Sequence, residues 1–126
     1  MNYNEIGDLG ADIISNMQQI TTLGLNNTNI TDTGLAYLST MPEITALYLN
    51  NNQISSAGVA IISKMQGITI LDLNNNQIGD TGAAHLSNMH EIRELYLKNN
   101  QIGVTGIAHI SNMRGITILL EFQVFL

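Results

Sequence analysis

The sequence predicts an α/β fold, a right-handed solenoid bent into a horseshoe arc, with parallel strands on the concave face and short helices on the convex face. Three observations lead to this prediction. An Ile-x-x-Leu-x-Leu frame begins at Ile20 and returns every 24 residues, at Ile44, Ile68 and Ile92. The Leu-x-Leu part is typical of a strand with alternating inward and outward side chains. The second half of each unit has apolar residues at helical i, i+3 and i+4 spacing. A fixed period of this length indicates a stacked repeat array.

The period divides the chain into stacked units that we predict to form one domain, residues 1–126. Four units are complete: 20–43, 44–67, 68–91 and 92–115. Residues 1–19 match the back half of a unit, with Ile6 in the place of Ile30, so we expect the chain to begin inside a repeat without a capping segment. Each complete unit is expected to contribute one strand and one helix to a common core.

The repeat frame fails near the C-terminal end. Ile116 starts a further strand, but Glu121 replaces the second Leu and no Asn-rich turn follows. Apolar residues then stand at every second position: Leu120, Phe122, Val124 and Leu126. We interpret residues 116–126 as a degenerate terminal strand, which is either a primitive cap or the tail of a truncated or frame-shifted reading frame. An apolar edge strand of this kind can pair with another chain and form a homo-oligomer.

The helical half of each unit is predicted to bury one apolar stripe. Helix N-caps are expected just before these stripes, at Asp32, Ser56 and Asp80. Each stripe ends with a methionine: Met17, Met41, Met65, Met89 and Met113. Because these methionines end a buried stripe, we predict that they belong to the core and do not form a soft-metal path or a pliable binding groove.

Composition and charge exclude several classes of function. The formal net charge is −6, and the four basic residues are scattered along the chain: Lys64, Arg93, Lys98 and Arg114. Without a basic patch we expect no nucleic-acid partner and no membrane partner, and a basic or neutral protein is mildly favoured as partner. The chain has no cysteine, which excludes disulfides, thiolate chemistry and Cys-ligated zinc.

The sequence shows no targeting or membrane-spanning segment. The N-terminus lacks the charged and apolar regions of a signal peptide, and no apolar run approaches membrane-spanning length. We therefore expect a soluble protein of the cytoplasm, and secretion through some other signal stays open.

The frame Leu-x-Leu-x-x-Asn-x-Ile, as in residues 47–54, resembles the leucine-rich repeat family over nearly the whole chain. In that family the Asn turns inward, which here implies a structural asparagine ladder of Asn52, Asn76 and Asn100. A buried turn leaves backbone groups that need partners, and an amide supplies both donors and an acceptor. Thr28 stands at this place in the first complete unit and can form fewer hydrogen bonds, so we expect a looser turn there.

No arrangement of residues indicates catalysis, so we expect no enzyme, no catalytic residue and no cofactor. The serines that recur in phase have no positioned base, and the recurring glycines form no phosphate-binding loop. His85 and His109 share a phase in adjacent units and could bind zinc together, but no third ligand is evident. We therefore expect no metal site.

Function is expected on the outward side chains of the strands. Tyr48, Asp72 and Tyr96 share one column, where two aromatic rings flank a carboxylate, and tyrosine suits protein interfaces. The inward frame hardly changes, whereas this column varies, which is typical of a binding scaffold and also of unconstrained surface positions. The candidate binding residues are Tyr48, Asp72, Tyr96, Asn50, Asn74, Ile70, Glu94, Lys98 and Arg93.

The units also resemble 24-residue bacterial leucine-rich repeats of the GALA-like type found in secreted effectors, because Asn-x-Ile is followed by Gly-Leu-Ala, Gly-Val-Ala, Gly-Ala-Ala or Gly-Ile-Ala. Some members of that group carry an F-box, but none is visible here, so ubiquitin-ligase recruitment is not implied. The resemblance implies protein–protein recognition. Together with the varied column of the strands, it leads us to predict a non-catalytic module that binds a protein partner on its concave face. It would act in the cytoplasm, or in a host cell reached without a conventional signal peptide. Two alternatives stay open: a self-assembling or dimerising fragment that uses its uncapped ends, and a truncated piece of a longer leucine-rich repeat protein.

Overall fold

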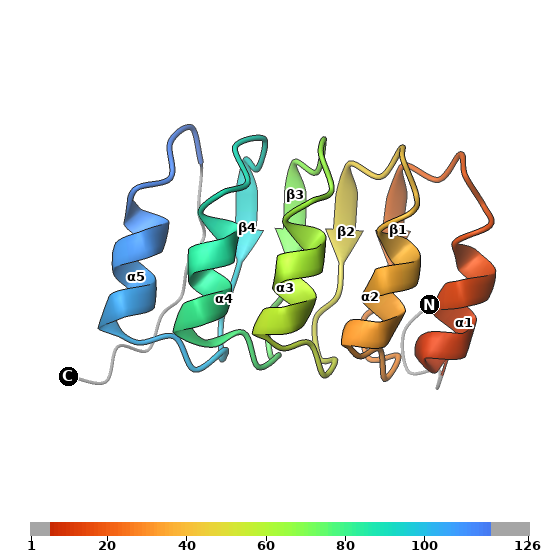
Figure 1. Cartoon of the computed structure of the whole chain (residues 1–126), viewed down its shortest axis with the longest axis horizontal. Coiled ribbons are helices and arrows are strands. Elements are labelled where there is room, and N and C mark those ends of the chain that lie inside the picture. Colours follow the sequence, from red (N-terminus) through yellow and green to blue (C-terminus); the bar gives the residue numbers. More distant parts are fainter. Residues whose placement is uncertain (1–5, 117–126) are drawn as a thin grey trace.

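The structure is a computed structural model that describes residues 6–116. Helices and strands alternate along this part of the chain: α1 (Gly7–Ile14), β1 (Thr22–Gly24), α2 (Asp32–Leu38), β2 (Ala46–Tyr48), α3 (Ser56–Ile62), β3 (Ile70–Asp72), α4 (Gly79–Leu86), β4 (Glu94–Tyr96) and α5 (Val104–Ser111). The strands form one parallel sheet in chain order, and the helices form a second layer over one of its faces (Figure 1). The predicted right-handed α/β solenoid is confirmed. The predicted strand after Ile116 lies outside the described residues.

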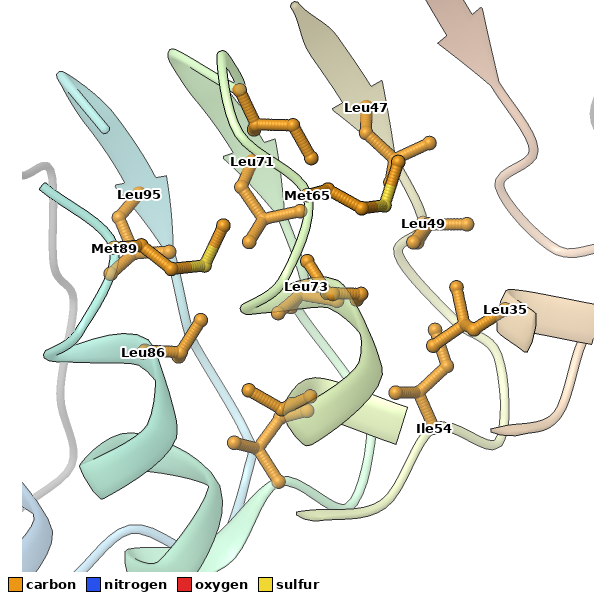
Figure 2. Packing of buried hydrophobic residues seen from close by; sticks show 14 of the residues in the cluster. Leu35, Leu47, Leu49, Ile54, Met65, Leu71, Leu73, Leu86, Met89 and Leu95 are labelled. Atoms are coloured by element: carbon orange, nitrogen blue, oxygen red, sulfur yellow. The ribbon is translucent and has the colours of Figure 1, made fainter. Parts of the chain in front are cut away.

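Neighbouring strands pair with an offset of one whole unit. Leu47 of β2 lies opposite Leu23 of β1 and Leu71 of β3, and Leu95 of β4 continues the row. Figure 2 shows three of these leucines together with Met65 in one apolar cluster. Full burial of one such side chain contributes about 1.5–3 kcal/mol. The 24-residue period therefore becomes a set of apolar rows that run through the whole stack.

The methionines that recur in each unit are buried in the core only where their unit is stacked between two others. Met41, Met65 and Met89 are buried, but Met17 is 54% exposed and Met113 is half-buried. Met17 follows α1, the first helix of the described chain, so no described unit covers its outer side (Figure 1). The prediction that this series is core is therefore wrong for Met17, because a period fixes the phase of a residue but not its number of neighbours.

The predicted N-caps are wrong: in α2 and α3 the cap lies one residue earlier than predicted, and α4 has no side-chain cap. The side chains of Thr31 and Ser55 accept a hydrogen bond from the helix backbone two residues later, so they cap α2 and α3. Asp32 and Ser56 are instead the first residues of these helices, and Asp80 lies in the first turn of α4, which has no side-chain cap. The hydroxyl of Thr31 caps α2, so the carboxylate of Asp32 is not needed as a cap and bonds another unit instead.

The aspartates connect each helix to the next unit, in contacts that we call the aspartate ties. Three are present in the described chain: Asp8 to Thr31, Asp32 to Ser55 and Asp80 to Gly103. In each tie the backbone N–H of the later residue donates to Oδ1, at 2.9, 2.9 and 2.7 Å respectively. The hydroxyls of Thr31 and Ser55 also donate to the second carboxylate oxygen. Hydrogen bonds to a carboxylate are stronger than neutral ones, so the ties hold the helix layer together.

The recurring glycines make room for these carboxylates. A Cβ atom at Gly58 would lie 2.2 Å from Asp32 Oδ1, and one at Gly106 would lie 2.5 Å from Asp80 Oδ1. Any larger residue at these positions would displace the carboxylate from its tie. The glycine of one unit and the aspartate of the preceding unit therefore form a single packing feature.

One joint lacks the tie, because Ser56 stands in the place of aspartate. Gly79 stands where the tie would end, but its backbone N–H bonds the following unit instead: it donates to the carbonyl oxygen of Asn100 at 2.8 Å, and Gly79 has φ +66°. The tied residues Thr31 and Ser55 are extended, with φ −111° and −105°. Positive φ costs a residue with a Cβ atom about 1–2 kcal/mol. The joint between α3 and α4 is therefore of a second kind that needs glycine.

We predict opposite effects of serine at two glycines that share one phase. Gly103 is extended (φ −100°), and a Cβ atom there would only touch Asp80 Oδ2 at 3.5 Å. A serine hydroxyl at 103 can bond Asp80 and cap α5, and loss of glycine restricts the unfolded chain, so Gly103→Ser should raise the free energy of unfolding by about 0.5–1 kcal/mol. Gly79→Ser should lower it by about 1–2 kcal/mol, since φ is positive there. Urea denaturation followed by circular dichroism measures both changes. Changes of the same sign would contradict the two kinds of joint.

Candidate functional site

The outward side chains of the four strands form one surface, which we call the strand face. The register arranges them in two rows across the sheet: Thr22, Ala46, Ile70 and Glu94 in the first row, and Gly24, Tyr48, Asp72 and Tyr96 in the second. Tyr48, Asp72 and Tyr96 thus lie side by side on β2, β3 and β4, and each is half-buried. The structure brings together the three residues that the period placed in one column.

The carboxylate of Asp72 is held on both of its oxygens. Oδ2 accepts a hydrogen bond from Asn50 Nδ2 at 2.8 Å, and Oδ1 accepts one from the backbone N–H of Asn74 at 3.1 Å. A carboxylate has about four lone-pair sites, so each oxygen can accept a further donor from outside. The group is therefore fixed in orientation and still able to bind a partner.

Tyr96 is oriented by a neighbour on its own strand. Its hydroxyl donates to Glu94 Oε1 at 3.1 Å. This hydrogen bond is the main cause that raises the pKa of Tyr96 above its usual value of 10, and partial burial and the negative charges of Glu94 and Asp72 raise the pKa further. The phenol therefore stays protonated at neutral pH and presents an uncharged aromatic ring.

The other predicted binding residues differ in what they contact. Asn50 bonds Asp72, and Asn74 Oδ1 accepts from the backbone N–H of Lys98 at 2.7 Å, so both amides connect adjacent units. The remaining predicted residues are half-buried in the first row or exposed at the two ends of β4: Ile70, Glu94, Arg93 and Lys98. Ala46, which lies in the first row, is buried between its neighbours. The amides thus have a structural role that their position in the sequence did not reveal.

The buried asparagines of the turns form a ladder behind this face: Asn52, Asn76 and Asn100. The Nδ2 group of Asn76 donates to the carbonyl oxygens of Leu49 (3.0 Å) and Leu73 (3.1 Å), which belong to two different units. Its Oδ1 accepts from the backbone N–H of Ile54 at 3.1 Å. Among the described residues, each buried side-chain polar atom has a hydrogen-bond partner. The ladder therefore satisfies backbone groups that the turns would otherwise bury without partners.

The turn at Thr28 is closed, contrary to the expectation of a looser one. Thr28 is fully buried, and its hydroxyl donates to the carbonyl oxygen of Leu25 at 2.6 Å. Its backbone N–H donates to Asn52 Oδ1 at 3.1 Å. A threonine suffices here because Asn52 of the following unit supplies the bond that crosses the joint.

We predict that Asn76→Ala lowers the free energy of unfolding by about 1–3 kcal/mol or more, because it leaves buried backbone groups in two units without partners. Gln77→Ala is the matched control, since Gln77 is the exposed neighbour in the same turn and should change stability by less than about 0.5 kcal/mol. Thermal denaturation of the two variants measures the difference. Equal melting temperatures would show that the buried amide is dispensable.

The histidines do not form a recognisable metal site. His85 is half-buried, whereas His90 and His109 are exposed. Within residues 6–116, no group of three or more His, Cys, Asp or Glu side chains could hold a metal ion. A hollow of about 330 Å³ lies next to His90, at the edge where α4 and α5 end, and is lined by Ser87, Met89, His90, Asn112, Met113 and Arg114. It holds no acid–base pair that would indicate catalysis.

Sequence reasoning missed an apolar surface on α1 and in the segment just after it, which we call the α1 patch: Leu9, Ile13 and Met17. These side chains are 74, 61 and 54% exposed. The sequence held a signal for this surface. Leu9 occupies the repeat position that Thr33 takes one unit later, and Ile13 the position that His85 takes three units later. An apolar side chain at an outward phase marks a surface that water does not favour.

Comparisons with known proteins agree with this geometry. Two sequence models described as leucine rich repeat match residues 42–102 and 17–39. Forty chains of solved structures match significantly; one is the crystal structure of an internalin (inlF) from Listeria monocytogenes, with a TM-score of 0.76 and 26% sequence identity. The match covers 91% of this chain and 33% of the internalin, so the chain spans about a third of that protein's length. No curated protein matches the chain significantly. In the part of the chain that the structure describes, no helix has the length and apolar character needed to cross a membrane.

Proposed function

Because this chain is a leucine-rich repeat protein, of a family that typically mediates protein interactions and is usually non-catalytic, we propose that it binds a protein partner on its strand face and has no enzymatic activity. The proposal treats residues 1–126 as one repeat domain. The proposed partner is a protein. The proposal includes no nucleic acid, no membrane and no cofactor.

The single observation that supports the proposal most is the row of Tyr48, Asp72 and Tyr96. All three side chains are half-buried on adjacent strands, on the face that the helices leave uncovered. Tyrosine gives a large contact area and a hydroxyl at low entropic cost, which makes it common at binding hot spots. The proposed contact residues are those of the row and its surroundings: Tyr48, Asp72, Tyr96, Asn50, Asn74, Ile70, Glu94, Lys98 and Arg93.

The compartment in which the chain acts is also part of the proposal. The likeness of the units to repeats of secreted bacterial effectors supports action in a host cell, reached without a conventional signal peptide. Action in the cytoplasm of the producing cell is the other form of the proposal.

Partner capture tests the strand face directly. We expect the triple variant Tyr48→Ala, Asp72→Lys, Tyr96→Ala to lose at least about tenfold in partner capture from a host lysate, since hot-spot residues dominate binding. The variant His85→Ala, His109→Ala changes the helix side and should capture the partner as the parent does. Circular dichroism confirms that both variants are folded. Equal capture by all three proteins would rule out the strand face.

A second function, self-assembly through the ends of the stack, is favoured by the α1 patch. Repeat arrays need a polar outer face on their terminal units for solubility, whereas Leu9 and Ile13 expose most of their surface. Stacking of a second copy on α1 would cover these side chains. This would give a head-to-tail assembly or a dimer.

We expect light scattering to separate the two functions. If the α1 patch mediates assembly, the parent chain should be oligomeric at micromolar concentration, and Leu9→Glu together with Ile13→Glu should make it monomeric. Thr33→Glu is the control, because Thr33 is exposed and holds the phase of Leu9 one unit later. A parent chain that stays monomeric over a wide range of concentrations would eliminate self-assembly.

A further inference from the structure

The spacing of Tyr48 and Tyr96 suits one flat group between their rings. Adjacent strands lie about 4.8 Å apart, so side chains two strands apart are separated by roughly 10 Å. Two van der Waals contacts between a planar group and the flanking rings take up about 7–8 Å. We call the place above Asp72, between the two flanking tyrosines of the row, the tyrosine slot. A Cβ atom at Gly24, the next residue of the row, would meet nothing within 4 Å, so the row is open beyond Tyr48.

The charges of the two rows indicate the sign of the occupant. Asp72 and Glu94 are acidic, and no residue of the two rows is basic: the others are Thr, Ala, Ile, Gly and Tyr. The carboxylate of Asp72 is fixed by Asn50 and by the backbone of Asn74, yet it has lone pairs for further donors. A cation is therefore favoured over a neutral or an anionic group.

The shape of the slot favours arginine over lysine. A guanidinium group is planar, stacks on aromatic faces and can donate two parallel hydrogen bonds to a carboxylate, whereas an ammonium group is a compact and strongly hydrated point charge. Attraction between a cation and the face of a tyrosine ring adds to this preference. The hydrogen bond from the Tyr96 hydroxyl to Glu94 raises the pKa of this phenol, so its ring stays uncharged at neutral pH.

We infer that the tyrosine slot binds an arginine side chain of the protein partner, with the guanidinium group stacked between Tyr48 and Tyr96 and hydrogen-bonded to Asp72. This inference rests on the proposed function, because it names the group that the strand face recognises. The partner would then present an arginine at a loop tip or on an extended segment that can reach the inner side of the arc.

The test uses N-acetyl-arginine amide as the probe and N-acetyl-citrulline amide as its uncharged isostere. In NMR titrations of the full chain, the arginine probe should shift the ring signals of Tyr48 and Tyr96 saturably. The citrulline probe should bind at least about tenfold more weakly. Equal binding of the two probes, or no saturable shift with arginine, would overturn the inference.

Variants assign the binding to the slot. Asp72→Asn should weaken the arginine probe at least about tenfold, whereas Glu43→Gln, which removes an exposed carboxylate outside the strand face, should leave it unchanged. Tyr48→Phe keeps the ring and should bind, and Tyr48→Ala should not, so the inference stays testable if Asp72→Asn fails to fold. Binding that persists in Tyr48→Ala would overturn it.

The two proposals can fail separately, because the probe needs no partner protein. Partner capture that depends on the strand face, together with no preference for the arginine probe, would overturn the slot and leave the protein-binding function intact. Arginine binding in the slot, together with partner capture that ignores the triple variant, would support the slot as a cation site and count against the strand face as the partner surface.

Discussion

The buried amide of the turn asparagine is the interaction on which the rest of the structure depends. Through Asn76, the carbonyl oxygens of Leu49 and Leu73 are held by one Nδ2 group at 3.0 and 3.1 Å, although they belong to different units. A single side chain thus fixes one turn upon the next. A buried polar group without a partner costs about 1–3 kcal/mol, so one unit cannot slip along another without losing these bonds. The leucine rows inside the sheet and the tyrosine row outside it both follow from this fixed register.

The helix layer is held by a separate set of bonds, and the two sets are not equally complete. The joint between α3 and α4 lacks an aspartate tie, because Ser56 replaces the carboxylate. The strand face of the same joint carries the bond between Asn50 Nδ2 and Asp72 Oδ2, at 2.8 Å. Stability in a repeat array is roughly a sum of units and of contacts between neighbours. A bond on one face of a joint can therefore offset part of what the other face lacks.

The sequence predicted features that depend on the position of a residue within the repeat unit. It missed features that depend on which residues of other units surround it. The position of Tyr48 beside Asp72 followed from the period, since parallel strands of identical units pair in one register. The cap of α2 did not follow, because Thr31 and Asp32 are both good caps and the choice depends on Asp8, which lies 23 residues earlier. The exposure of Met17 was missed for a similar reason, because its phase matches the buried methionines while its outer neighbour is absent from the described chain.

On the strand face, the amides beside the tyrosine row hold adjacent units together. Next to the tyrosine row, Asn26 Oδ1 accepts from the backbone of Asn50 at 2.8 Å, and Asn74 Oδ1 accepts from the backbone of Lys98 at 2.7 Å. These amides satisfy backbone groups, so a change there leaves a donor without its partner. The side chains of Tyr48 and Tyr96 satisfy no backbone group in the bonds described above, since the hydroxyl of Tyr96 bonds the side chain of Glu94. The two tyrosine rings can therefore change while Asp72, the amides and the inward leucines and asparagines keep the stack unchanged.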